Sequence, residues 1–283
     1  MLPNEPNPEV TRSEFDFATN GFTFSDDFSS IYQENDQYVA WCWKAGGTAV
    51  SNSNGTITSN VSANTDAGFS IVSYTGNLTA GATVGHGLNS APEWILVKSR
   101  DSASNWEVKH VGLSSNDHML KLNNADAEED LNSWNNTAPT SSVFSLGAAN
   151  GTNKSGDDFI AYCWHSVEGF SKFGSYEGNN ISDGTFVYLG FKPALVIFKN
   201  IDATGHWVMY DSTRNTSNPV NKRLLANHEN DEGAGTTMYV DFLSNGFKHR
   251  NTDQDLNTAH TFVYMAWAQH PFGGENAPPA TAR

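Results

Sequence analysis

The stretch that decides the fold is Pro92–His110, PEWILVKSRDSASNWEVKH, because it occurs again as Pro193–Asp211, PALVIFKNIDATGHWVMYD. A proline, a lysine, an aspartate and a tryptophan recur at one offset: 193 − 92, 199 − 98, 202 − 101 and 207 − 106 each give 101. In both copies an apolar run of strand length ends in a polar turn, and a second strand starts at the tryptophan. The pattern predicts a β-hairpin whose first strand is buried on both faces.

A second element occurs three times, as Tyr38–Trp43 (YVAWCW), Phe159–Trp164 (FIAYCW) and Phe262–Trp267 (FVYMAW). Each is an apolar, aromatic run that follows a glycine-containing turn signal, such as Asn20–Gly21 or Asn245–Gly246. Asn-Gly between apolar runs favours a β-hairpin, because both residues tolerate positive φ. The chain is therefore built from a repeated unit, in which the first hairpin leads and the tryptophan-ending run trails.

The repeats divide the chain into segments. Residues 68–168 are predicted to form repeat 1, and residues 169–272 to form repeat 2. Residues 1–47 match the trailing half of a preceding repeat, residues 48–67 read as a linker or loop, and residues 273–283 as a C-terminal tail. Either the sequence is the C-terminal part of a longer protein, or the half-unit completes a sheet in repeat 1. We favour the first interpretation.

Composition narrows the fold class and the partners. The 283 residues include 16 Lys and Arg against 31 Asp and Glu, which gives a formal net charge of −15. This balance argues against a nucleic-acid partner, because such proteins neutralise phosphates with basic residues. Apolar stretches such as Trp94–Val97 are far shorter than the ~20 residues of a membrane helix, so no membrane insertion is expected. Short strands separated by turn formers predict an all-β chain of tandem β-sandwich repeats, such as jelly rolls.

Sequence motifs for catalysis or metal binding are missing. The two cysteines, Cys42 and Cys163, occupy equivalent positions where the third copy has Ala266, so they read as small core residues. The acidic clusters Asp126–Asp130 and Asp253–Asp255 could hold a structural Ca²⁺ ion, supply a glycosidase carboxylate pair, or be solvated loops. We expect no catalytic residues and no cofactor.

The tryptophans are the best candidates for contact with a ligand. Trp106 and Trp207 follow polar turns, and Trp134 lies in a polar loop, so each indole could offer a flat face to a sugar ring. Asn105 and His206, at the hairpin tips, could bond sugar hydroxyls. The alternative is that these indoles only pack the hairpins. Trp43, Trp164 and Trp267, which end apolar strands, are expected in the core.

Five strings resemble a family: a repeated domain of unknown function in tail-fibre-like structural proteins of marine and cyanobacterial tailed phages. They are Tyr38–Gly47, Val84–Leu88, Val167–Tyr176, Gly190–Pro193 and Asp241–Lys248. The resemblance covers about residues 10–272. It implies a virion context and a lectin-like sandwich fold, and it transfers no catalytic residues.

The leading hypothesis is a non-enzymatic phage virion protein, a tail fibre or receptor-binding protein that recognises a host-surface glycan. It would lie on the exposed surface or tail of the virion, contact other virion proteins and form a homotrimer. A purely structural component, such as a head-decoration protein, is the alternative, and it predicts that Trp106 and Trp207 are buried. A glycan depolymerase is the third possibility.

Overall fold

The computed structural model describes residues 1–11, 15–24, 35–234 and 237–270. Within these ranges the regular structure is nearly all β, with 21 strands and one four-residue helix, α1 (Asn150–Asn153). All the strand pairs are antiparallel, so the chain belongs to the all-β class, as predicted. No helix among the described residues is long and apolar enough to cross a membrane.

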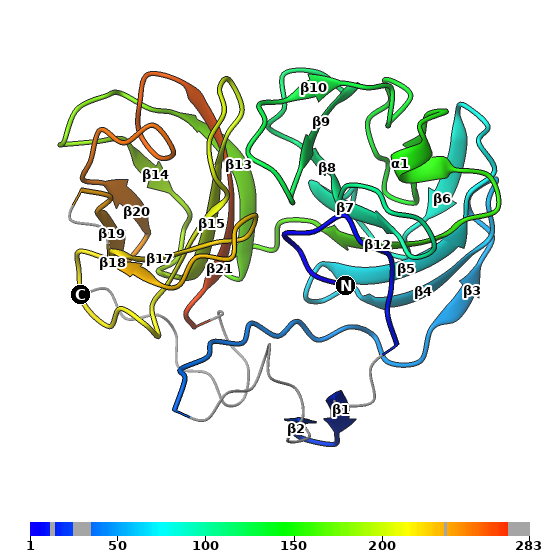
Figure 1. Cartoon of the computed structure of the whole chain (residues 1–283), viewed down its shortest axis with the longest axis horizontal. Coiled ribbons are helices and arrows are strands. Elements are labelled where there is room, and N and C mark those ends of the chain that lie inside the picture. Colours follow the sequence, from blue (N-terminus) through cyan, green and yellow to red (C-terminus); the bar gives the residue numbers. More distant parts are fainter. Residues whose placement is uncertain (12–14, 25–34, 235–236, 271–283) are drawn as a thin grey trace.

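Figure 1 shows two lobes side by side. Lobe 1, in cyan and green, has an eight-stranded sheet and a two-stranded sheet, with a core of residues such as Val72, Ile95 and Phe144 between them. In spatial order the large sheet is β10 (Glu129–Asp130), β9 (His118–Lys121), β8 (Glu107–His110), β7 (Trp94–Ser99), β12 (Asp158–Trp164), β5 (Phe69–Thr75), β4 (Ser59–Asn64) and β3 (Val50–Asn52). The small sheet is β11 (Val143–Leu146) and β6 (Ala82–Gly85).

Lobe 2 repeats this plan with a six-stranded and a three-stranded sheet around a second core, which includes Phe198, Tyr210 and Phe247. The large sheet is β13 (Ser171–Glu177), β21 (Thr261–Ala268), β15 (Pro193–Asn200), β16 (Val208–Asp211), β17 (Lys222–Leu225) and β18 (Gly233–Ala234). The small sheet is β14 (Phe186–Tyr188), β20 (Gly246–His249) and β19 (Val240–Leu243).

The hairpin predicted from the duplicated stretch is present in both lobes. β7 pairs with β8 and β15 pairs with β16 in matching register, with Trp94 opposite His110 and Leu195 opposite Asp211. Every residue of β7 is buried, and so is every residue of β15 except Ala194. The prediction of a first strand buried on both faces is confirmed.

A buried hydrogen bond to the backbone is also copied between the lobes. The Tyr74 hydroxyl donates to the carbonyl oxygen of Thr152 at 2.7 Å, and the Tyr176 hydroxyl donates to that of Leu256 at 2.6 Å. Both tyrosines lie in the first strand of their repeat and are almost fully buried. A buried hydroxyl needs a partner, so this bond ties each first strand to the loop before the tryptophan-ending strand.

The segment 48–67, predicted as a linker or loop, is instead part of lobe 1. Its strands β3 and β4 extend the large sheet beyond β5, with Val61 opposite both Val50 and Val72. Ile57, Ser59 and Val61 are buried and the residues between them are exposed. The prediction was wrong because the many Ser, Asn and Thr residues concealed an alternation with period two.

Residues 15–24 and 35–47 form a third, smaller part, which lies below both lobes in Figure 1, whereas residues 1–11 lie against lobe 1. This part contains the hairpin β1 (Phe15–Ala18) and β2 (Gly21–Phe24) and the run Tyr38–Trp43. The hairpin is present as predicted, but its turn is Thr19–Asn20, because Gly21 pairs with Ala18 in the ladder.

A third apolar cluster, which we call the central cluster, joins the three parts. It contains Leu96 from lobe 1, Met265 from lobe 2 and the three tryptophans that end the repeated run. Trp164 and Trp267 are buried and Trp43 is half-buried, so their predicted core position is confirmed. The ring centroids are 6.1 Å apart for Trp43–Trp164, 5.2 Å for Trp43–Trp267 and 6.5 Å for Trp164–Trp267, all edge to face. Equivalent residues thus meet at a point of approximate threefold symmetry.

Candidate functional site

Trp207 lies in the contact between the lobes and is fully buried. Its indole Nε1 donates to the carbonyl oxygen of Lys121 in lobe 1, at 2.9 Å. Its backbone N–H donates to Asn227 Oδ1 at 3.0 Å. Both polar groups of this tryptophan are therefore satisfied by protein atoms, and its ring is not available to a sugar.

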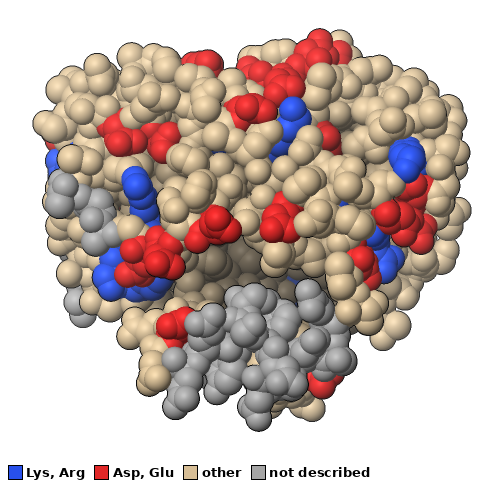
Figure 2. Space-filling view, in the orientation of Figure 1, with Lys and Arg blue, Asp and Glu red and all other residues tan. Residues whose placement is uncertain are grey.

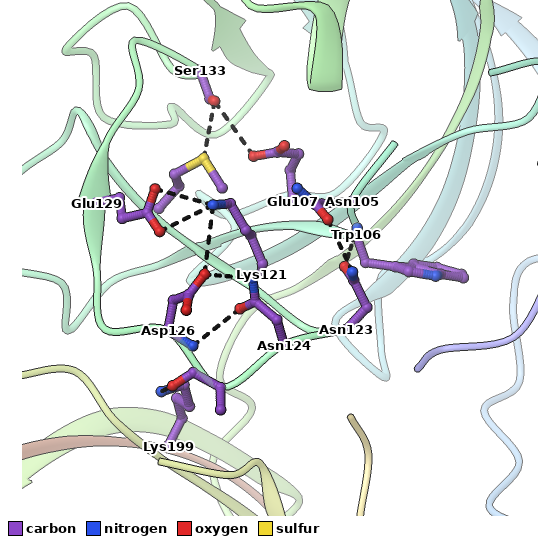
Figure 3. A network of polar contacts seen from close by, with 12 residues as sticks. Asn105, Trp106, Glu107, Lys121, Asn123, Asn124, Asp126, Glu129, Ser133 and Lys199 are labelled. Atoms are coloured by element: carbon purple, nitrogen blue, oxygen red, sulfur yellow. Dashed lines mark hydrogen bonds and ion pairs between the residues drawn. The ribbon is translucent and has the colours of Figure 1, made fainter. Parts of the chain in front are cut away.

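Trp106 makes the equivalent contact with the N-terminal segment. It is 6% exposed, its Nε1 donates to the carbonyl oxygen of Leu2 at 3.0 Å, and its N–H donates to Asn123 Oδ1 at 2.8 Å. In Figure 3 the Trp106 ring points away from the polar network around Lys121, and Asn123 reaches its backbone. Residues 2–9 therefore contact lobe 1 in the same way as lobe 1 contacts lobe 2.

The match between the two contacts extends over three hydrogen bonds. The contact of the N-terminal segment with lobe 1 has Trp106 Nε1 to Leu2 O, Ser104 N to Pro6 O, and Glu9 N to Arg100 O. The contact of lobe 1 with lobe 2 has Trp207 Nε1 to Lys121 O, Gly205 N to Ala125 O, and Glu128 N to Ile201 O. Residues 2, 6 and 9 map onto 121, 125 and 128 at an offset of 119, and residues 100, 104 and 106 map onto 201, 205 and 207 at an offset of 101. The repeats are joined head to tail by one conserved geometry.

Asn105 and His206 hold the residues that clamp these tryptophans. Asn123 Nδ2 donates to Asn105 Oδ1 at 2.9 Å, and Asn227 Nδ2 lies 3.1 Å from His206 Nδ1. The two predicted ligand residues therefore perform the same internal role in their repeats. Figure 3 shows the first of these pairs beside Trp106.

Trp134 is the clearest correction to the sequence analysis. It was expected to be exposed, yet it is fully buried in the core of lobe 1, with the Lys109 ammonium 5.8 Å from its ring. The following Asn135 and Asn136 adopt positive φ values of 51° and 44°, so the chain turns sharply directly after the indole. Asparagine tolerates this conformation, and the polar residues therefore form a turn at the surface while the ring packs in the core.

None of the three indoles proposed as sugar platforms is exposed, so the exposure that the ligand hypothesis assumed for them is not observed. The recurrence of a tryptophan after a polar turn is explained by contacts between parts of the chain. A tryptophan after a polar turn marks the place where the preceding part of the chain docks.

Residues 2–271 match one protein family, described as a domain of unknown function (DUF7483). The chain belongs to this family. No curated protein and no solved structure matches the chain.

In this family member, two buried lysines at equivalent positions also shape the hairpin tips. Lys199 is fully buried, and its Nζ donates to the carbonyl oxygens of Asn200 at 2.7 Å and of Ala125, across the lobe contact, at 3.3 Å. Burial lowers the pKa of Lys199 to about 8. Lys98 is buried in the same way, and its pKa is also lowered by burial. The recurrence of this lysine within an apolar strand is itself a sequence signal, because a buried ammonium group needs hydrogen-bond partners.

His110 adds a second polar link between the lobes. Its Nε2 lies 3.3 Å from the carbonyl oxygen of Tyr264 in lobe 2, and its Nδ1 accepts from the N–H of Gly112 at 3.0 Å. This pattern places the ring proton on Nε2. Burial lowers the pKa of His110 to about 3, so the ring is neutral at neutral pH.

Glu107 is the most perturbed carboxyl group of lobe 1. It is 6% exposed, and burial raises its pKa to about 7, against the attraction of Lys121. Its nearest polar partner is Ser133 Oγ at 3.5 Å (Figure 3). The position corresponds to Val208 in lobe 2, so the carboxyl group occupies a site that the repeat otherwise fills with an apolar side chain.

The acidic clusters are occupied by protein partners. Lys121 bonds both oxygens of Glu129 at 3.0 Å and lies 3.8 Å from Asp126, and Asp255 Oδ1 accepts from the His206 N–H. No group of three or more His, Cys, Asp or Glu side chains in the described ranges is arranged to hold a metal ion. Cys163 is buried, with its pKa raised to about 12 by burial, so its predicted core position is confirmed. Cys42 is exposed, so the same prediction is wrong for it.

Proposed function

We propose that the chain is a non-enzymatic structural component of a phage virion, built from tandem β-sandwich repeats of jelly-roll or lectin-like type. The virion context rests on the resemblance stated in the sequence analysis. The pairing of a large and a small sheet in each lobe supports the sandwich repeats. One observation favours a structural role over glycan recognition: Trp106 and Trp207 are buried in the contacts between repeats.

The contacts between repeats suit a component that carries load. Each hairpin tip buries an indole, satisfies its N–H and adds two backbone hydrogen bonds to the neighbouring part. Buried, satisfied polar groups fix one geometry, because every alternative leaves a group unpaired. The central cluster adds an apolar core that belongs to all three parts at once.

The non-enzymatic part of the proposal rests on how the carboxyl groups are used. A glycoside hydrolase needs two carboxyl groups ~5–9 Å apart that face a sugar. In this chain Glu107 is buried, and Glu129, Asp211 and Asp241 pair with basic side chains. Figure 2 shows acidic side chains spread over both lobes, with basic side chains beside several of them.

The proposed partners are other virion proteins, and the proposed location is the exposed surface or tail of the virion. The proposed assembly is the homotrimer expected of a fibre, and it rests on the same resemblance.

Two measurements test this function. Immunogold labelling of intact virions should place the chain on the particle. The purified chain should bind neither host lipopolysaccharide nor capsule on a glycan array, and it should release no reducing ends from them. Saturable glycan binding would support the receptor-binding hypothesis if Trp207→Phe weakens it while circular dichroism shows that the fold is intact. Release of reducing ends would overturn the proposal that the chain is not an enzyme.

A further inference from the structure

Among the described residues, the head-to-tail order of the repeats leaves one contact with only one of its two sides. We call residues 121–128 of lobe 1 the docking segment, because Lys121, Ala125 and Glu128 bond the hairpin tip of lobe 2. Residues 2–9 are the docking segment of the N-terminal part. Residues 225–232 are its counterpart in lobe 2, between β17 and β18.

Strand register establishes this counterpart. In lobe 1, Met119 pairs with Glu129 and His118 with Asp130. In lobe 2, the pairs are Arg223 with Gly233 and Lys222 with Ala234, at a constant offset of 104. The bonding atoms of a docking segment therefore correspond to Leu225 O, Glu229 O and Glu232 N. Residues 228–232 are all exposed, whereas only Asp126 of the lobe 1 docking segment is.

The N-terminal part also has a surface that is exposed although its counterpart in lobe 2 is buried. Its hairpin β1–β2 has the register of β19–β20 at a constant offset of 225, with Phe17 opposite Phe22 and Phe242 opposite Phe247. Phe242 and Phe247 are 4% and 0% exposed, in the core of lobe 2. Phe17 and Phe22 are 85% and 38% exposed.

The difference lies in what covers each hairpin. In lobe 2 the phenylalanines pack against Tyr176, Phe198 and Tyr210, all from the leading half of the repeat. The described residues before Trp43 include no counterpart of that half. Phe17 and Phe22 instead line an open apolar cavity of about 430 Å³, together with residues 38–43.

We propose that this apolar face binds a third leading half-unit of the same repeat, with the sequence pattern of residues 68–119. Its hairpin would cover Phe17 and Phe22, and its hairpin tip would take the docking segment 225–232 of lobe 2. The three repeats then form a closed ring around Trp43, Trp164 and Trp267.

One observation favours this occupant over a second copy of the chain. Lobe 2 already contacts the N-terminal part, because the Arg214 guanidinium lies 6.0 Å from the Trp41 ring. The open face thus continues an interface whose geometry is seen twice in this chain, as a ring of heterologous contacts requires.

The test joins residues 68–119 directly before Met1 of the full chain and follows amide hydrogen exchange of β1 and β2. Exchange in both strands should slow at least about tenfold relative to the original chain, because they become part of a packed core. Binding of an apolar fluorescent dye should fall in parallel. The matched control carries Asp at the copies of Val72 and Val97 in the added segment, and it should leave exchange in β1 and β2 unchanged.

Unchanged exchange in β1 and β2 while the added segment is itself protected would overturn the proposal. Concentration-dependent dimerisation of the original chain that protects β1 and β2 equally well would overturn it too, in favour of a second copy. A second variant covers the case in which the added segment fails to fold. Phe22→Ser in the original chain should reduce dye binding without changing the thermal midpoint of the lobes, and unchanged dye binding would contradict an open face.

Discussion

The hairpins β1–β2 and β19–β20 have the same pattern and opposite surroundings. Asp-Phe, two residues and Asn-Gly-Phe occur in both, at residues 16–22 and 241–247, and the strand registers coincide. Yet Phe17 is 85% exposed and Phe242 is 4% exposed. The local sequence is enough to set the turn and the register, whereas burial depends on a leading half that only lobe 2 provides.

The largest expected effect compares the second phenylalanine of each hairpin. Phe247→Ala should lower the free energy of unfolding by about 3–5 kcal/mol, because it opens a cavity in a fully packed core. Phe22→Ala should cost less than about 1 kcal/mol, because that side chain is already 38% exposed. Urea unfolding followed by tryptophan fluorescence measures both. Equal losses would mean that the two hairpins are equally packed in solution.

Glu107 distinguishes the core of lobe 1 from that of lobe 2, which has Val208 at this position. Because its folded-state pKa is raised to about 7, from an ordinary value of 4.5, its contribution to stability is complete below pH 4.5 and is lost as the pH rises through 7. Glu107→Gln removes this loss. The variant should match the original chain near pH 4.5 and exceed it by up to about 3 kcal/mol at pH 8.

Urea unfolding at a series of pH values measures that difference. Glu177→Gln, at an exposed strand end, is the matched control for the replacement of a carboxyl group by an amide. A constant difference for Glu107→Gln would show that its carboxyl group is hydrated in the folded chain.

The third comparison concerns the two docked indoles. Trp207→Phe should cost about 2 kcal/mol, because it removes the stronger of the two hydrogen bonds to the carbonyl oxygen of Lys121 in a contact between two complete lobes. Trp106→Phe should cost less than about 1 kcal/mol, because Leu2 is itself exposed and water can replace the indole. Thermal midpoints of the two variants, measured side by side, test this order, and a larger loss for Trp106→Phe would reverse it.

The sequence was informative wherever the repeat itself carried the signal. The offset of 101 residues predicted two equivalent hairpins, and the run ending in Trp43, Trp164 and Trp267 predicted core positions, which the structure confirms. A sequence pattern that occurs twice indicates that the two segments have similar surroundings in the fold. A strand that is buried on both faces needs continuous apolar residues. These features depend on neighbours within one repeat.

The candidate site could not be predicted in the same way, because it lies between repeats. Trp207 is buried by Lys121, which is 86 residues away, and nothing in the turn before Trp207 reveals that contact. Trp134 was misjudged because its polar neighbours cover it from above. Residue type predicts average exposure, whereas the exposure of a particular side chain depends on tertiary packing.

The smallest expected change in stability at neutral pH concerns a position at which the two hairpins differ. His249 in β20 corresponds to Phe24 in β2, and its ring stacks on Tyr176 at 4.9 Å within an aromatic core. Neither ring nitrogen of His249 has a hydrogen-bond partner among the described residues, and burial lowers its pKa to about 3. His249→Phe should therefore raise the free energy of unfolding by about 1 kcal/mol at pH 7.

Lowering the pH should increase the stability difference between His249→Phe and the original chain. A histidine whose folded-state pKa is lowered contributes stability above its unfolded value of 6.5 and loses it as the pH falls toward 3, so the advantage of His249→Phe should grow by about 2 kcal/mol at pH 5. His228→Phe, at an exposed position in the same lobe, should show no such growth. If His249→Phe gains nothing between pH 7 and pH 5, the imidazole is hydrated in the folded chain, and the core of lobe 2 is less tightly closed over His249 than over Phe247.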